Sequence, residues 1–140
     1  PERVFIDTNI FIYAIFDKNS QKREKVIKLL DKLQNKGKKE VIISTQVLGE
    51  IFNTLHRKFK VDKNKIIDKL EIIAENTIIK DITETTVRQS WEIAKKNNYS
   101  YYDCLIIASA LENKCKILYS EDMQDGHSLD GQLKIINPCK

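Results

Sequence analysis

Short apolar runs alternate along the chain with longer segments in which apolar residues recur every three or four positions. A short apolar run between polar stretches predicts a strand that is buried on both faces. Such strands are expected at residues 3–6, 41–44, 77–82, 116–120 and 133–136. The periodic segments predict helices, at residues 9–16, 21–36, 46–59, 62–75, 83–94 and 101–111. The alternation of strands and helices predicts an α/β fold, with a parallel sheet covered by helices on both faces.

The last of these helices, within the run YYDCLIIASAL, is apolar on nearly every side and is expected to be buried. Asp103 stands at its head. An ionised carboxylate in a core is costly unless a partner meets it, so Asp103 either has a local partner or belongs to a site. The spacing Ser100-x-x-Asp103 fits a capping box, which is the local explanation.

The helix before it is expected to be capped by Thr83, since a threonine directly before a periodic segment can accept the first free N–H groups. Its apolar residues Val87, Trp91 and Ala94 share one face at helical spacing.

The length of 140 residues fits one domain, because a chain of this size buries roughly two-thirds of its unfolded surface without a covalent staple. No internal repeat, low-complexity tract or linker divides the sequence. A single domain is therefore expected over residues 1–140.

Cysteine, histidine and hydropathy argue against several classes of protein. Cys104, Cys115 and Cys139 have no C-x-x-C spacing, so neither a disulfide framework nor a zinc site is indicated, and a reducing cytoplasm is expected. His56 and His127 stand alone, which gives no support to a catalytic triad. No secretion signal or membrane-spanning run is recognisable. A net charge of +4 is compatible with a polyanionic partner or simply with solubility.

Four acidic residues are placed where ligands bind in open parallel sheets, outside the carboxyl ends of the strands. Asp7 directly follows the first strand and Asp122 follows the fourth. Asp103 reaches the same edge if the loop before its helix returns there. Glu50 lies on the rim of the apolar stripe of the helix at residues 46–59.

Each of these acids also has an ordinary explanation. Asp7 could cap the next helix, Asp122 could be a loop residue in water, and Glu50 is one of several surface glutamates. The set is more informative, because converging carboxylates repel one another unless they share protons or bind divalent cations. Oxygen ligands favour Mg²⁺ or Mn²⁺, and such an ion can activate water for phosphodiester hydrolysis.

Four segments, FIDTNIFIYA, STQVLGEIFNTL, YYDCLIIASAL and KILYSEDMQDG, resemble the PIN-domain ribonucleases, in particular the VapC-like toxins of toxin-antitoxin pairs. The resemblance spans nearly the whole chain in the family's order. It implies a three-layer α/β/α sandwich whose parallel sheet of about five strands has the order 3-2-1-4-5.

The same resemblance implies a site. Asp7, Glu50, Asp103 and Asp122 would be the catalytic acids that hold Mg²⁺ or Mn²⁺, with Asp125 as an auxiliary ligand. Thr8, Asn9 and Ser120 would orient carboxylates or bind phosphate. The implied reaction is in-line attack of activated water on RNA, which leaves a 5′-phosphate and a 3′-hydroxyl. Family members often dimerise and are silenced by an antitoxin.

Basic residues near the second strand could guide the RNA backbone, although a solvated charged face is the more ordinary explanation for them. They are Lys38, Lys39, Arg57, Lys58 and Lys60.

Two other functions compete with the nuclease. A haloacid-dehalogenase-like phosphatase also has an aspartate after its first strand, but it needs a second one where this chain has Asn9. A PIN domain without activity, serving as a scaffold that binds RNA or protein, would be favoured by the loss of an acid. All four acids are present.

Overall fold

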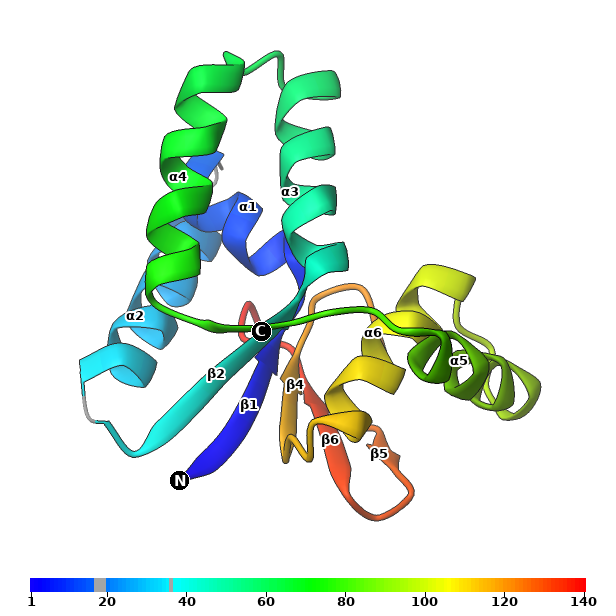
Figure 1. Ribbon diagram of the computed structural model, residues 1–140. Coiled ribbons are helices and arrows are strands. Elements are labelled where there is room, and N and C mark those ends of the chain that lie inside the picture. Colours follow the sequence, from blue (N-terminus) through cyan, green and yellow to red (C-terminus); the bar gives the residue numbers. More distant parts are fainter. Residues whose placement is uncertain (17–19, 36) are drawn as a thin grey trace.

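The computed structural model describes residues 1–16, 20–35 and 37–140, and six strands in it form one sheet with the order β3-β2-β1-β4-β6-β5 (Figure 1). The strands are β1 (Glu2–Ile6), β2 (Lys39–Ser44), β3 (Ile78–Lys80), β4 (Ile117–Tyr119), β5 (Ser128–Leu129) and β6 (Leu133–Ile136). All neighbouring strands are parallel except β5, which is antiparallel to β6. The five predicted strands and their order are therefore confirmed, with β6 as the fifth.

β5 was not predicted from the sequence. It is joined to β6 by a tight turn in which Asp130 and Gly131 both have positive φ, 53° and 64°. Asp-Gly is a strong hairpin signal, because glycine and aspartate tolerate this backbone conformation. The strand has only two residues, too few for a hydrophobic pattern to reveal it.

Within the described residues, six helices connect the strands. They are α1 (Thr8–Phe16), α2 (Ser20–Asn35), α3 (Thr45–Arg57), α4 (Lys63–Glu75), α5 (Glu84–Lys96) and α6 (Tyr101–Glu112). These bounds confirm the helices predicted from the pattern, except that Lys36, the last residue of the second predicted helix, lies outside the described residues. Among the described helices, none combines the length and apolar character needed to cross a bilayer.

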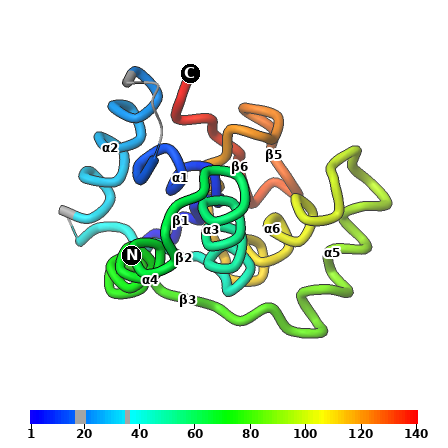
Figure 2. Tube along the Cα trace, turned by 90° about the horizontal axis from the view of Figure 1, so that it is seen from above, coloured from blue at the N-terminus to red at the C-terminus, as the bar shows by residue number. Residues whose placement is uncertain are grey.

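The helices make two outer layers. α1 and α2 lie on one side of the sheet and α5 and α6 on the other, while α3 and α4 form a hairpin that rises beyond the carboxyl ends of the strands (Figures 1 and 2). The predicted α/β/α sandwich is thus confirmed. Val4, Phe5 and Ile6 are all buried, as expected for a central strand covered on both faces.

α6 is the buried helix that the sequence predicted. Every residue from Cys104 to Ala110 is buried, and the Ser100 hydroxyl accepts the N–H of Asp103 at 3.2 Å, so Ser100 caps the helix. Thr83 likewise caps α5 through a capping box with Thr86.

The apolar face of α5 that carries Val87, Trp91 and Ala94 is not its buried face. Thr86, Ser90 and Ile93 are buried, whereas Trp91 is 48% exposed. The small side chains let α5 pack against α6, and the Thr86 hydroxyl donates to Glu112 at 2.6 Å, which satisfies it inside the contact. Apolar spacing located this helix, but its small polar residues determine which face packs.

Candidate active site

Asp7 lies at the carboxyl edge of the sheet, where β1 separates β2 from β4. Its backbone N–H donates to the carbonyl of Tyr119 on β4, at 3.0 Å. Asp7 is 4% exposed as a residue, and its carboxylate accepts two hydrogen bonds, from the N–H of Thr8 at 2.7 Å and from the Ser120 hydroxyl at 2.8 Å. Asp7 therefore meets the start of α1, and it also lies beside the segment after β4, as the edge argument predicted.

Glu50 reaches the same edge from α3. The Thr8 hydroxyl donates to its Oε1 at 2.8 Å, which joins the first residue of α1 to the helix that follows β2. Thr8 thus touches two acids, since its N–H bonds Asp7 and its hydroxyl bonds Glu50.

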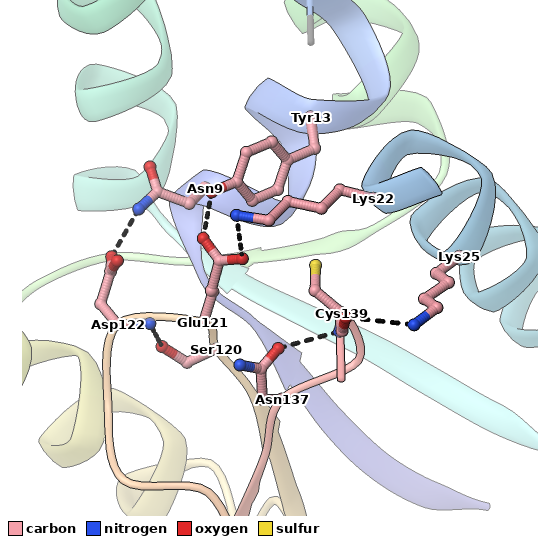
Figure 3. A network of polar contacts seen from close by, with 9 residues as sticks. All are labelled: Asn9, Tyr13, Lys22, Lys25, Ser120, Glu121, Asp122, Asn137 and Cys139. Carbon is pink, nitrogen blue, oxygen red and sulfur yellow. Dashed lines mark hydrogen bonds and ion pairs between the residues drawn. The ribbon is translucent and has the colours of Figure 1, made fainter. Parts of the chain in front are cut away.

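Asp122 comes to this edge from the segment after β4. Its Oδ2 accepts from the Asn9 side-chain amide at 2.5 Å, and its N–H donates to the Ser120 hydroxyl at 3.3 Å (Figure 3). Ser120 therefore connects Asp7 with Asp122, one through its donor and the other through its acceptor.

Asp103 enters from the start of α6, half-buried. This end of α6 is tied to α3, because the Gln46 amide donates to the carbonyl of Tyr102 at 3.2 Å. The backbone N–H of Asp103 is therefore part of a helix cap, and its carboxylate also interacts electrostatically with Asp7, Glu50 and Asp122.

Electrostatic interactions make these acids one cluster. Burial raises the pKa of Asp7 to about 7, and repulsion from Asp122 and Asp103 adds to the effect, although hydrogen bonds from Ser120 and Thr8 oppose it. Burial also raises the pKa of Asp103, and Glu50 repels it further. Partial burial is the main cause that raises the pKa of Asp122, and repulsion from Asp103 raises it further. Ionising the three aspartates together is therefore unfavourable.

In the described part of the chain, the ion pairs formed by basic residues involve other acids, such as Arg3 with Glu40 and Lys22 with Glu121. No three of its carboxylate, thiol or imidazole groups are arranged as a ready-made cage for an ion. Instead, Thr8, Asn9 and Ser120 donate to the acids. The donor set, four carboxylates without nitrogen or sulfur, fits a hard divalent cation.

Asp125 does not join the cluster. Its Oδ1 accepts the N–H of Asn137 at 2.7 Å, and its Oδ2 lies 3.8 Å from Nζ of Lys140. In this arrangement Asp125 holds the C-terminal segment.

The five basic residues proposed from the sequence fall into two groups. Lys39 begins β2 at the opposite, amino edge of the sheet and pairs with Glu2 at 3.2 Å, and Lys38 precedes it. Arg57, Lys58 and Lys60 lie where α3 ends and the chain turns toward α4, beyond the carboxyl edge (Figure 1). Proximity in sequence to the second strand did not mean proximity in space, because α3 carries the chain away from the sheet.

Glu121 was overlooked in the sequence. Its carboxylate accepts a hydrogen bond from the Tyr13 hydroxyl and pairs with Nζ of Lys22 at 2.8 Å (Figure 3). Burial acts to raise the pKa of Glu121, but Lys22 and Tyr13 hold it below its ordinary value, so this acid is ionised. The available signal was its place directly after β4, on the edge that had drawn attention to Asp122.

Comparisons with known proteins agree with this architecture. The sequence model of the PIN domain family matches residues 4–124, and the chain belongs to that family. No curated protein sequence matches it significantly.

Solved structures share the fold. The chain is similar to Mycobacterium tuberculosis VapC20, a sarcin-ricin loop cleaving toxin, with a TM-score of 0.68 and 17% identity, covering 84% of this chain and 88% of that one. It is also similar to DNA-bound VapBC from Salmonella typhimurium, with a TM-score of 0.72 and 15% identity, covering 99% of this chain and 100% of that one. For VapBC2 from Rickettsia felis, bound to a promoter DNA fragment, the TM-score is 0.64 and the identity 22%, covering 84% of this chain and 86% of that one.

Proposed function

We propose that this protein is a divalent-metal-dependent endoribonuclease. The observation that carries the proposal is the electrostatic coupling of Asp7, Glu50, Asp103 and Asp122, in which burial and mutual repulsion raise the pKa of the three aspartates. Membership of the PIN domain family, whose nucleases generally use divalent ions, supports the same function.

The four acids would hold Mg²⁺ or Mn²⁺. Such an ion, when bound, lowers the pKa of water and polarises a phosphodiester. The chain's contribution is to keep the carboxylates together at a cost that a cation removes. Attack in line on the RNA backbone would leave a 5′-phosphate and a 3′-hydroxyl.

Thr8, Asn9 and Ser120 would orient the acids. Each of them donates to a different carboxylate, at 2.8 Å to Glu50, 2.5 Å to Asp122 and 2.8 Å to Asp7. Glu50 and Asp122 each accept through one oxygen, which keeps the other available to a ligand, whereas both oxygens of Asp7 accept hydrogen bonds from the chain. By fixing the carboxylates, these donors reduce the ordering that ion binding requires.

Arg57, Lys58 and Lys60 would contact the RNA backbone. They lie on the α3–α4 hairpin, which extends on the same side of the sheet as the acids (Figure 1). Lys38 and Lys39 lie at the far edge and are not part of this proposal.

The biological setting we propose is that of a toxin in a toxin-antitoxin pair, acting in the cytoplasm as a homodimer and silenced by an antitoxin protein. Its fold resembles VapC20, described as a toxin, and chains of VapBC complexes. The three cysteines are free, in keeping with a reducing compartment.

A haloacid-dehalogenase-like phosphatase is disfavoured. The residue two positions after Asp7 is Asn9, and its side chain donates to Asp122 instead of supplying an acid.

The test is cleavage of a defined RNA with Mg²⁺, with Mn²⁺ and with a chelator, followed by sequencing of the new ends. We expect wild-type protein to cut only with the metals and to leave 5′-phosphates. Asp7→Asn and Asp103→Asn should lose cleavage while circular dichroism shows an intact fold. Glu40→Gln, at the other edge of the sheet, is the control and should cut normally. Full cleavage by either aspartate variant would contradict the assignment.

A further inference from the structure

Glu121 connects three elements next to the acid cluster. It lies in the segment after β4, between Ser120 and Asp122, and its side chain is 18% exposed. One carboxylate oxygen accepts from Tyr13 on α1, and the other pairs with Lys22 on α2 at 2.8 Å (Figure 3). The Nζ of Lys22 also lies 5.0 Å from the centroid of the Tyr13 ring.

The contact between Glu121 and α1 runs beside a second one. Asn9 and Tyr13 are one helical turn apart, so their side chains lie on the same face of α1. They bond two consecutive residues, Asn9 to Asp122 and Tyr13 to Glu121. Two adjacent hydrogen bonds therefore hold the segment after β4 against the helix.

We propose that Glu121 is a positioning residue that fixes the carboxylate of Asp122 in the site, and this inference rests on the proposed function. Both oxygens of Glu121 already have partners within the chain, so it is not offered as a ligand. Its link to Tyr13 and Lys22 fixes the peptide that carries Asp122. When that link is lost, Asp122 is held through Asn9 and Ser120 alone.

A purely stabilising ion pair is the competing explanation, and the chain offers a matched control for it. Arg3 and Glu40 form a comparable long-range ion pair at 3.0 Å, with both side chains 33% exposed, at the amino edge of the sheet. Loss of this pair removes an equal charge without touching the segment after β4.

Three variants separate position from charge. Glu121→Gln removes the charge but keeps an oxygen that can accept from Tyr13. Glu121→Ala removes both. Tyr13→Phe keeps the charge and the pair with Lys22 but removes the hydrogen bond to α1.

The first measurement is Mn²⁺ binding to the free protein by calorimetry. We expect Glu121→Ala to weaken binding about tenfold, the range found when groups that orient metal ligands are removed. Glu121→Gln should lose clearly less than Glu121→Ala, Tyr13→Phe should also weaken binding, and Glu40→Ala should match wild type. Equal losses in Glu121→Gln and Glu121→Ala, or wild-type binding in Glu121→Ala, would overturn the proposal.

The second measurement needs neither ion nor RNA. The side-chain amide of Asn9 reports on Asp122 in a ¹H–¹⁵N NMR spectrum, and its signals should move in Glu121→Ala and Tyr13→Phe but stay in Glu40→Ala. Unmoved signals in the first two variants would overturn the positioning role.

If the signals move as expected while wild-type protein cuts no RNA, the proposed nuclease function fails and the positioning of Asp122 by Glu121 stands. If Glu121→Ala does not fold, Tyr13→Phe and Glu121→Gln carry both measurements.

Discussion

Acidic residues at the two edges of the sheet have different kinds of partners. At the amino edge, where β1 and β2 begin, Glu2 pairs with Lys39 at 3.2 Å and Glu40 with Arg3 at 3.0 Å. At the carboxyl edge, where the same two strands end, Asp7 and its neighbours receive hydrogen bonds from hydroxyl and amide groups instead. The first edge neutralises these acids within the chain. At the second, Glu121 is paired with Lys22, but Asp7, Glu50 and Asp122 accept from uncharged donors, which leaves negative charge for a ligand to neutralise.

The largest expected effect of this difference is on stability without metal. The pKa of Asp7 lies above its ordinary value of 3.8, at about 7. At about 1.4 kcal/mol per pKa unit, ionised Asp7 costs the fold at most roughly 4 kcal/mol above pH 7. Asp7→Asn should therefore be more stable than wild type in urea unfolding at pH 8 with a chelator present.

The pH dependence of this stability difference follows from the raised pKa of Asp7. A carboxyl whose folded pKa is raised favours folding most at low pH and loses that contribution as pH rises to about 7. The advantage of Asp7→Asn should hence shrink toward pH 4. Glu40→Gln should instead lose less than about 1 kcal/mol at pH 8, as for an exposed ion pair. An Asp7→Asn protein less stable than wild type at pH 8 would show that the carboxyl edge is already compensated.

The next effect concerns metal affinity and pH. Below pH 7 an ion must displace the proton of Asp7, so Mn²⁺ affinity should rise about tenfold per pH unit, roughly a hundredfold from pH 5 to pH 7. The raised pKa values of Asp103 and Asp122 act in the same direction. Calorimetry at unit pH steps measures this. An Mn²⁺ affinity that is constant between pH 5 and pH 7 would contradict the view that Asp7 is protonated in this range and binds the ion.

The smallest effect separates the basic residues of the two edges. Lys58→Gln and Lys60→Gln should each weaken RNA binding a few-fold and lower the salt slope by about 0.7, the value for one lost phosphate contact with a single strand. Lys39→Gln at the amino edge should leave the slope unchanged, because that lysine pairs with Glu2. Fluorescence anisotropy in a chelating buffer measures binding without cleavage. Equal slopes for all three variants would contradict a role for the α3–α4 hairpin.

Local patterns predicted the elements and two of the acids well. A polar residue that directly follows a buried strand must lie at the end of that strand, so Asp7 and Asp122 could be placed on one edge from the sequence. Asp103 needed the family resemblance as well, because its place depends on where the loop before α6 returns.

Relations between distant residues could not be predicted. The pair of Lys22 with Glu121 depends on how α2 packs beside the segment after β4, which no local pattern encodes. The same limit explains the basic residues, since Lys39 and Lys60 are near in sequence but belong to opposite ends of the molecule. On α5, apolar spacing favoured Trp91, whereas packing against α6 selected the small residues Thr86 and Ser90.

The outer strands of the sheet bear on how other polypeptides can associate with this one. β3 and β5, the strands at its two margins, contain three and two residues. Unpaired backbone groups on a long margin invite another chain to add itself as a further strand, and short marginal strands remove that template. A protein that attaches by strand addition would find few hydrogen bonds here. Association through helices is therefore the mode that this sheet favours, and intermolecular β-aggregation of the folded state is disfavoured.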